Sequence, residues 1–204
     1  MRKVLANHLF ERARAYCLEF RPNEAETAAS VSPITYRNLK SKKFLSEYCW
    51  VVYASGFKAD TIEKVFPSLR TAFKDFDINS LGRTRSIRPA LAIFNNERKA
   101  ASFLRGAHLI SAEGFSKFKS RLTSEGVDLL EELPGIGPIT KYHLAKNIGL
   151  IDEAKPDIWL ERAAEATSCT VDQLVTHLSK KYQLSRHVVD IIVWRYGADK
   201  GLAL

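Results

Sequence analysis

Apolar residues recur at helical spacing along nearly the whole chain. In the first segment, residues 2–19, the apolar positions Val4, Leu9, Ala13 and Cys17 fall at intervals typical of one face of a helix. No convincing run of alternating apolar and polar residues, the pattern typical of a half-buried strand, is present. The pattern therefore predicts an all-α protein.

Breaks in the apolar pattern predict where helices end. Residues 44–53 form a strongly apolar segment that stops at Gly56, which is expected to cap its C-terminus. Pro67 is expected to separate two short helices, at 59–66 and 68–76, because proline suits the first turn of a helix. Two stretches are expected to be non-helical, the polar residues 21–32 and the irregular basic residues 79–88. Further helices are expected at 96–110, 116–122, 127–132, 138–148, 158–167, 171–182 and 185–196.

Charge and cysteine content narrow the class of protein. The 204 residues include 31 Lys and Arg against 23 Asp and Glu, and the net charge of +8 favours a polyanionic partner such as nucleic acid. The three cysteines, Cys17, Cys49 and Cys169, are too few and too scattered for a disulfide framework or a four-cysteine iron–sulfur cluster. No signal peptide or transmembrane run is visible, so we expect a cytoplasmic protein without a membrane partner, nucleoid-associated if the source is prokaryotic.

The segment Leu133-Pro-Gly-Ile-Gly-Pro-Ile-Thr-Lys141 is the most informative motif of the chain. Gly135 and Gly137 allow positive φ and are expected to leave backbone N–H groups uncovered. Pro138 suits the first position of the helix that follows. The start of that helix offers free N–H groups and a partial positive charge, a combination that binds phosphate. The same motif occurs in proteins that bind DNA without cutting it, so alone it indicates only phosphate contact.

An aspartate follows this hairpin at a fixed distance. Asp157 lies twenty residues after Gly137, behind a loop at 149–156 that contains glycine and proline. Taken alone, an aspartate at this position is most simply the N-cap of a helix. Together, the hairpin and Asp157 resemble the helix-hairpin-helix Gly/Pro-Asp superfamily of base-excision DNA glycosylases. The resemblance covers nearly the whole chain, is most specific at the hairpin and Asp157, and is weak before residue 30.

The resemblance implies a particular fold. Residues 1–204 would form one glycosylase-like unit with two helical lobes and no iron–sulfur cluster. One lobe would comprise residues 41–137 and end in the hairpin at 133–137, and the other would comprise residues 1–40 with 150–204. The active-site cleft would lie between these lobes.

The resemblance also implies a chemistry. Asp157 would be the catalytic carboxylate that stabilises positive charge on the deoxyribose while the base departs and that orients the attacking water. The target nucleotide would first be flipped out of the duplex. Bifunctional members place a lysine two positions after the second hairpin glycine, where this chain has Ile139, so a monofunctional enzyme is expected. Lys141 faces away from that position and Lys146 lies about 10 Å deeper along the helix, so a relocated lysine is the less favoured alternative.

Further roles follow from the resemblance. His143 is a candidate helper that would protonate or hydrogen-bond the departing base, and Phe57 is a candidate for the wedge inserted into the vacated base stack. The expected phosphate-binding residues of the hairpin are Gly135, Ile136, Gly137, Thr140 and Lys141. The expected base-pocket residues are Trp50, Tyr53, Ile139, Tyr142 and Trp159. Each of the aromatic residues would fit a plain core position as well.

Partners and cofactors follow in the same way. The expected partner is double-stranded DNA containing a damaged base, and the protein is expected to act as a monomer. No cofactor or metal site is expected, apart from a monovalent cation, K⁺ or Na⁺, at the hairpin carbonyl groups around Leu133 and Ile136. Basic residues expected to contact phosphates fall in two groups: Arg83, Arg85 and Arg88, and Lys117, Lys119 and Arg121.

Other classes of protein stay open. A non-catalytic helix-hairpin-helix protein would keep the glycines and the basic surface but would not need Asp157. A nuclease or AP lyase would require a metal cluster or a pocket lysine. The lesion also stays open among alkylated purines, oxidised guanine, deaminated bases and mismatches. An aromatic pocket and a water nucleophile favour alkylated purines, whose positive charge stacks well on aromatic faces.

Overall fold

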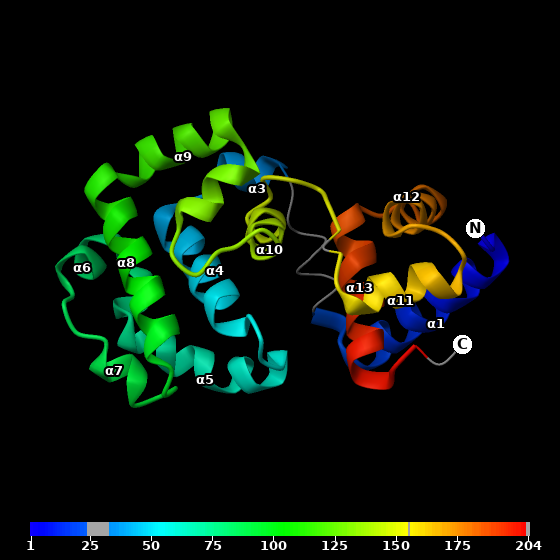
Figure 1. Ribbon diagram of the computed structural model, residues 1–204, viewed down its shortest axis with the longest axis horizontal. Helices are drawn as coiled ribbons and strands as arrows, with labels where there is room; N and C mark the ends of the chain where they lie inside the picture. Colours follow the sequence, from blue (N-terminus) through cyan, green and yellow to red (C-terminus); the bar gives the residue numbers. More distant parts are fainter. Residues whose placement is uncertain (24–32, 155, 203–204) are drawn as a thin grey trace. The chain divides into compact units, whose positions relative to one another are not determined.

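The computed structural model describes residues 1–23, 33–154 and 156–202, and the regular elements in these ranges are all helices (Figure 1). The prediction of an all-α protein is therefore confirmed for the described part of the chain. The polar break expected at 21–32 lies largely outside the described residues. None of the described helices is long and apolar enough to cross a membrane.

The chain divides into two compact units. The first comprises Met1–Thr35 and Ile151–Leu204, and the second comprises Tyr36–Leu150. The hairpin and the helix after it thus belong to the second unit, whereas Asp157 belongs to the first. The lobes expected at 41–137 and at 1–40 with 150–204, and the cleft between them, stay a prediction.

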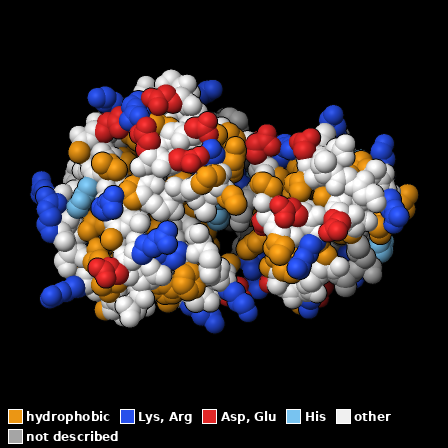
Figure 2. Space-filling view, viewed as in Figure 1, with side chains coloured by type: hydrophobic (Ala, Val, Ile, Leu, Met, Phe, Trp, Pro, Cys, Tyr) orange, Lys and Arg blue, Asp and Glu red, His pale blue; other side chains and the backbone are white. Residues whose placement is uncertain are grey.

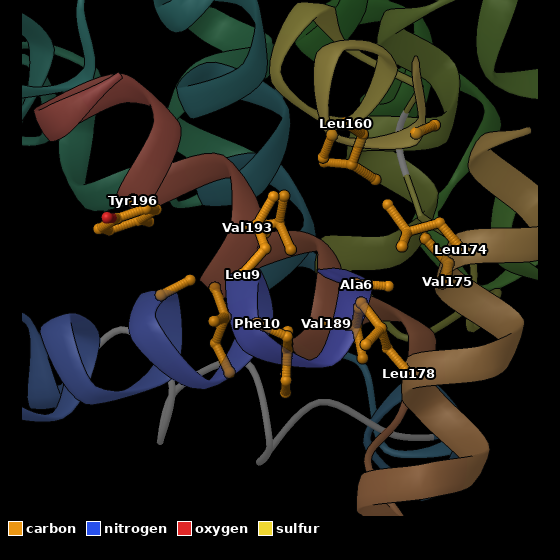
Figure 3. Packing of buried hydrophobic residues seen from close by; sticks show 14 of the residues in the cluster. Ala6, Leu9, Phe10, Leu160, Leu174, Val175, Leu178, Val189, Val193 and Tyr196 are labelled. Atoms are coloured by element: carbon orange, nitrogen blue, oxygen red, sulfur yellow. The ribbon is translucent and has the colours of Figure 1, made fainter. Parts of the chain in front are cut away.

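The first unit joins the two ends of the chain through helix packing. Its elements are α1 (Lys3–Phe20), α11 (Ile158–Ala166), α12 (Val171–Tyr182) and α13 (Arg186–Lys200). Leu9 and Phe10 of α1 pack in one buried cluster with Val189 and Val193 of α13 (Figure 3). Helices α11 and α12 close the same cluster with Leu160, Leu174, Val175 and Leu178 (Figure 3). Apolar residues at helical spacing on four helices thus form one core.

The second unit is built around α4. Its elements in chain order are α4 (Ser41–Ala54), α5 (Ala59–Ala72), η1 (Lys74–Phe76), α6 (Ile78–Arg83), α7 (Arg88–Leu91), α8 (Glu97–Glu113), α9 (Phe115–Glu125), η2 (Val127–Glu132) and α10 (Thr140–Asn147), preceded by α3 (Pro33–Arg37) at the boundary. Helix α4 packs against α5, η1, α8 and α10. Its buried side chains Phe44 and Tyr48 meet the rings of Phe118 and Phe103. Because α4 contacts both α8 and α10, it connects the centre of the core to the hairpin.

Two expected helix boundaries are wrong. Pro67 does not separate two helices, because α5 runs unbroken from Ala59 to Ala72 with Pro67 inside it. The ring of Pro67 is exposed, while Ile62 and Leu69 are buried on the opposing core face and hold the helix together across it. The basic stretch 79–88 is irregular only in part, since residues 79–83 belong to α6 and α7 begins at Arg88, while residues 84–87 between them are not helical. Asp77 begins α6 by accepting a hydrogen bond from the Ser80 N–H, a cap signal that the basic residues obscured.

Candidate functional site

The hairpin turns at one glycine rather than two. Gly135 has a φ of +86°, in the left-handed region that favours glycine, whereas Gly137 is not among the described residues with positive φ. The N–H of Ile136 donates to the Leu133 carbonyl at 3.0 Å and closes the turn. The expectation that both glycines supply positive φ is therefore corrected. An added Cβ at Gly137 would meet nothing within 4 Å, so openness is what this position provides.

The hairpin is fixed to α4 and α8 by close contacts. A Cβ at Gly135 would lie 3.2 Å from Ser102 Cβ and 3.3 Å from Val52 Cγ2, so the backbone turns directly against both helices. The buried Tyr48 hydroxyl donates to the Pro134 carbonyl at 2.6 Å and lies 3.1 Å from the Ser102 carbonyl. Burial also raises the pKa of Tyr48, which keeps this hydroxyl a donor. Tyr48 of α4 therefore stabilises the turn, a role that the sequence did not predict.

Fewer backbone donors face outward than expected. The Gly137 N–H donates to the Thr140 hydroxyl at 2.8 Å, so it is not uncovered. Thr140 therefore orders the turn through its side chain. Among the residues that the structure describes, the N–H groups of Ile139 and Thr140 have no hydrogen-bond acceptor. These two donors at the start of α10 are what the hairpin can offer to an anion.

Lys141 is paired with two carboxylates, which disfavours the phosphate contact expected of it. Its Nζ donates to Asp128 Oδ1 at 2.6 Å and to Glu131 Oε1 at 2.5 Å, and its side chain is nearly buried. Hydrogen bonds from these two carboxylates raise the pKa of Lys141. The lysine charge is thus neutralised within the unit, which corrects the phosphate role predicted for it. Tyr142 lies beside it, with the Lys141 ammonium 5.3 Å from its ring centre.

The surrounding basic residues fall into two kinds. Arg121 pairs with Glu113, Glu125 and Glu132, so its charge is compensated. Lys119 donates to the neutral carbonyl groups of Arg37 and Leu39, so its side chain is held in place but keeps its charge. Figure 2 shows acidic and basic side chains interspersed over α9 and the segment after it. Lys117, Arg83 and Arg88 have exposed side chains, as does Arg85, which also donates to the Gly82 carbonyl. Among these residues, Arg121 is therefore the one whose charge is neutralised by carboxylates.

Asp157 is the N-cap of α11. Its Oδ1 accepts hydrogen bonds from the N–H groups of Trp159 at 3.0 Å and Leu160 at 3.1 Å. The side chain is half-buried, and the two donors fix the plane of the carboxylate relative to the helix start. Capping and the partial positive charge of a helix N-terminus both favour the ionised form of an aspartate. The arrangement can therefore present a fixed negative charge at the end of a loop.

The loop before Asp157 is tied to α12 and α13. Asp152 accepts hydrogen bonds from the backbone N–H groups of Arg186 at 3.2 Å and His187 at 3.0 Å. The Arg186 guanidinium in turn pairs with Glu153 at 2.9 Å and Asp172 at 2.7 Å. These contacts fix the first part of the loop to the rest of the first unit. Sequence reasoning missed them because the partners lie more than thirty positions away from Asp152 along the chain.

The expected base-pocket residues are distributed between the two units. Tyr53 is fully buried in the second unit, with its ring 6.2 Å from Phe73 and 5.8 Å from Phe94, so the structure contradicts a pocket role for it. Trp50 is half-buried and packs edge-on against Phe66 at 5.3 Å. Tyr142 and His143 are half-buried on α10, and Ile139 is 59% exposed at its start.

Trp159 belongs to the packing of the first unit. An added Cβ at Gly197 of α13 would lie 2.8 Å from three ring atoms of Trp159, Cγ, Cδ2 and Cε3. The Arg162 guanidinium lies 5.0 Å from the centre of the same ring. The indole is therefore engaged by α13 and by its own helix, and because it is half-buried its expected place in the base pocket stays a prediction.

Phe57 is an exposed aromatic on a rigid support. It is 43% exposed and lies just after Gly56, which has a φ of +77° beyond the end of α4. Its ring packs edge-on against Phe94 at 5.1 Å, and Lys99 Nζ lies 5.2 Å from its centre. The same Nζ donates to the carbonyl groups of Val52 and Ser55 and so holds the end of α4. Sequence reasoning missed Lys99, since nothing in the pattern links α8 to this turn.

The second lysine of α10 lies in the interior. Lys146 is only 3% exposed, one turn beyond Tyr142 on the helix. Its neighbour Asn147 donates to Glu47 of α4 at 3.0 Å, so this end of α10 is packed on α4. No group of three or more potential metal ligands occurs among the described residues. The expected cation at the hairpin carbonyls stays a prediction.

Comparison of the chain with models of known protein families, with curated proteins and with solved structures finds no match.

Proposed function

We propose that this chain is a DNA glycosylase of the helix-hairpin-helix Gly/Pro-Asp type, folded as the two helical lobes of that superfamily. In this proposal it binds duplex DNA containing a damaged base and hydrolyses the N-glycosidic bond of the flipped nucleotide. The observation that carries the proposal is Asp157, a carboxylate held by two backbone donors at a helix start, twenty residues after a two-glycine hairpin.

The hairpin supports the DNA-binding part of the proposal. The N–H groups of Ile139 and Thr140 at the start of α10 would donate hydrogen bonds to one phosphate oxygen of the DNA backbone. Such contacts position a protein on DNA without reading its sequence. The exposed Phe57, on its support of Phe94 and Lys99, would fill the base stack after the nucleotide leaves. Filling the stack offsets part of the unstacking free energy, which is a few kcal/mol.

Asp157 supports the catalytic part. Departure of the base builds positive charge on the deoxyribose, and a carboxylate already fixed near that sugar stabilises the charge without reorganising. The same carboxylate would orient or deprotonate the attacking water. Its two capping hydrogen bonds engage Oδ1 from the helix side and keep the group in one orientation.

Three residues support water rather than an amine as the nucleophile. Ile139 stands where the bifunctional relatives have lysine and cannot form an imine. Lys141 is held between two carboxylates that raise its pKa, so its amine is protonated at neutral pH and cannot attack. Lys146 is only 3% exposed. The proposed enzyme is therefore monofunctional and leaves an intact abasic site.

The experiment that tests the proposal is a panel of duplexes, each with one alkylated, oxidised, deaminated or mismatched base. Alkali after incubation cuts the strand wherever a base has been released. We expect one lesion class to be cut with wild-type protein and not with Asp157→Asn. Because Tyr53 is buried, the expected aromatic pocket has one residue fewer, and the preference for alkylated purines is weakened. The panel therefore tests all lesion classes equally.

A further inference from the structure

Gly197 lies within α13, where a glycine has an energetic cost. Glycine in a helix costs about 1 kcal/mol relative to alanine. Its φ is not in the left-handed region, so its conformation would suit alanine equally well. Its side of the helix is buried, with no room for a methyl group. The absence of a side chain at Gly197 is therefore explained by what lies against it.

The neighbour is the indole face of Trp159. A Cβ built on Gly197 would be 2.8 Å from Cγ, Cδ2 and Cε3 alike, and equal distances to three fused-ring atoms place the glycine over the face of the ring. Real Cβ atoms essentially never approach another heavy atom this closely. Because Cγ is bonded directly to the Trp159 Cβ, the ring could make room for a methyl group only by leaving its rotamer or by shifting the start of α11. Gly197 thus allows the first turn of α11 to lie directly on α13.

Trp159 also holds the carboxylate of Asp157. The backbone N–H of Trp159 donates to Asp157 Oδ1 at 3.0 Å, two residues away. The position of the indole on α13 therefore fixes the position of the amide that orients the carboxylate. Among the aromatic and cation contacts of the described residues, the Trp159 ring has one, with the Arg162 guanidinium of the same helix, 5.0 Å from the ring centre.

We infer that Gly197 is a positioning residue for Asp157, acting through Trp159. The inference rests on the proposed function for its effect on base release, but its structural part stands alone. A methyl group at position 197 would displace the start of α11 and with it the carboxylate. Misplacement of a catalytic group by about 1 Å can cost on the order of a hundredfold in rate. DNA affinity, which depends on the hairpin in the second unit, would be unaffected.

The test is a double-mutant cycle of Gly197→Ala and Trp159→Ala. We expect Gly197→Ala to lower kcat for base release about tenfold or more while KM stays within about twofold of wild type. We expect the amides of Trp159 and Leu160 to lose hydrogen-exchange protection in the same variant. In the Trp159→Ala background, where the ring is gone, Gly197→Ala should change neither kcat nor the amide exchange further.

Gly106→Ala is the matched control. A Cβ at Gly106 of α8 would lie within 2.6 Å of the Tyr48 ring atoms, so the variant has the same kind of clash in the other unit. It should weaken DNA binding through the hairpin and leave the exchange of the two α11 amides unchanged.

Four results are decisive. Wild-type protection of the Trp159 and Leu160 amides in Gly197→Ala, or an equal effect of that change with and without the indole, would overturn the inference. Loss of protection with wild-type kcat would overturn its catalytic part. If wild-type protein releases no base from any duplex, the proposed function fails, and the amide exchange still decides whether Gly197 positions Asp157.

Discussion

The protonation of Lys141 bears directly on the reaction mechanism. An amine attacks the deoxyribose only after it has lost its proton, and the two carboxylates beside Lys141 favour the protonated form. We therefore expect no protein–DNA crosslink when borohydride is added during base release. Lys146→Met, which keeps the length of the buried side chain, should retain base release, because the proposed nucleophile is water.

The measurement is gel analysis of borohydride-treated reactions with the substrate that the panel identifies. Strand cleavage should appear only after alkali. A strong crosslinked band that vanishes in Lys146→Met or Lys141→Ala would show a relocated nucleophile and would contradict the monofunctional mechanism. Lys141→Ala should instead weaken DNA binding, because it leaves the negative charges of Asp128 and Glu131 without their counter-charge.

The sequence predicted the roles of some single residues and not of others. The N-cap geometry of Asp157 follows from local chemistry, since an aspartate before a helix accepts the nearest free N–H groups. The neutralisation of Lys141 does not, because its partners come from η2, ten and thirteen positions away. Tyr53 fits core and pocket equally well by spacing alone, and only its packing against Phe73 and Phe94 distinguishes the two.

The hairpin depends on the tyrosine beneath it. Tyr48→Phe removes the hydroxyl that donates to the Pro134 carbonyl at 2.6 Å and keeps the ring. Losing a buried hydrogen bond costs about 1–3 kcal/mol, and here the cost falls on the turn itself. We expect weaker binding to undamaged and abasic duplexes alike, by several-fold, with kcat preserved at saturating DNA.

Fluorescence anisotropy with labelled duplexes measures this effect. Tyr36→Phe is the control, because its hydroxyl bonds Thr123 of α9 and not the hairpin. Unchanged affinity for both duplexes in Tyr48→Phe, or an equal loss in Tyr36→Phe, would mean that the turn does not depend on Tyr48.

Helices were easier to predict than their ends. Long amphipathic segments such as α1, α8 and α12 follow from apolar spacing, because burial of one face determines them. The start of α10 does not follow, since the turn 138–139 precedes it and Thr140 caps the Gly137 N–H through its side chain. Pro67 shows the same limit: the core contacts of Ile62 and Leu69 override a local helix breaker.

The two ends of the chain are joined by a charged network in the first unit. Asp199 of α13 accepts hydrogen bonds from Tyr16 at 2.9 Å and Arg21 at 3.1 Å. Burial alone would raise the pKa of Asp199, but these hydrogen bonds and the nearby charge of Arg195 together lower it. A lowered pKa means that the ionised group stabilises the fold above its unfolded pKa of about 3.9, and that this contribution is lost as pH falls through the folded value.

Asp199→Asn should therefore lower the free energy of unfolding by about 1–3 kcal/mol at neutral pH. The difference from wild type should shrink as pH falls below about 4, where the aspartate itself becomes neutral. Urea denaturation of both proteins across the pH range measures it. A difference that stays constant down to low pH would show that Asp199 acts through packing and not through its charge.

The division of the chain into units could be predicted only in part. The apolar pattern of α1 shows that it needs a partner, but not that the partner is α13 at the other end of the chain. Contacts between segments so far apart depend on the matching of buried faces, which a single sequence does not reveal. The all-helical class, in contrast, follows from spacing alone.

The central claim is that Asp157 releases a base, and one comparison tests it most directly. Single-turnover base release by wild type and Asp157→Asn is measured on the duplex that the lesion panel identifies, together with the affinity of each protein for that duplex. We predict that the variant binds equally well or slightly better, because a negative charge near the phosphates is gone, and releases base at least about a hundredfold more slowly. A variant that keeps more than about a tenth of the wild-type rate would contradict the account, since losing such electrostatic stabilisation costs far more.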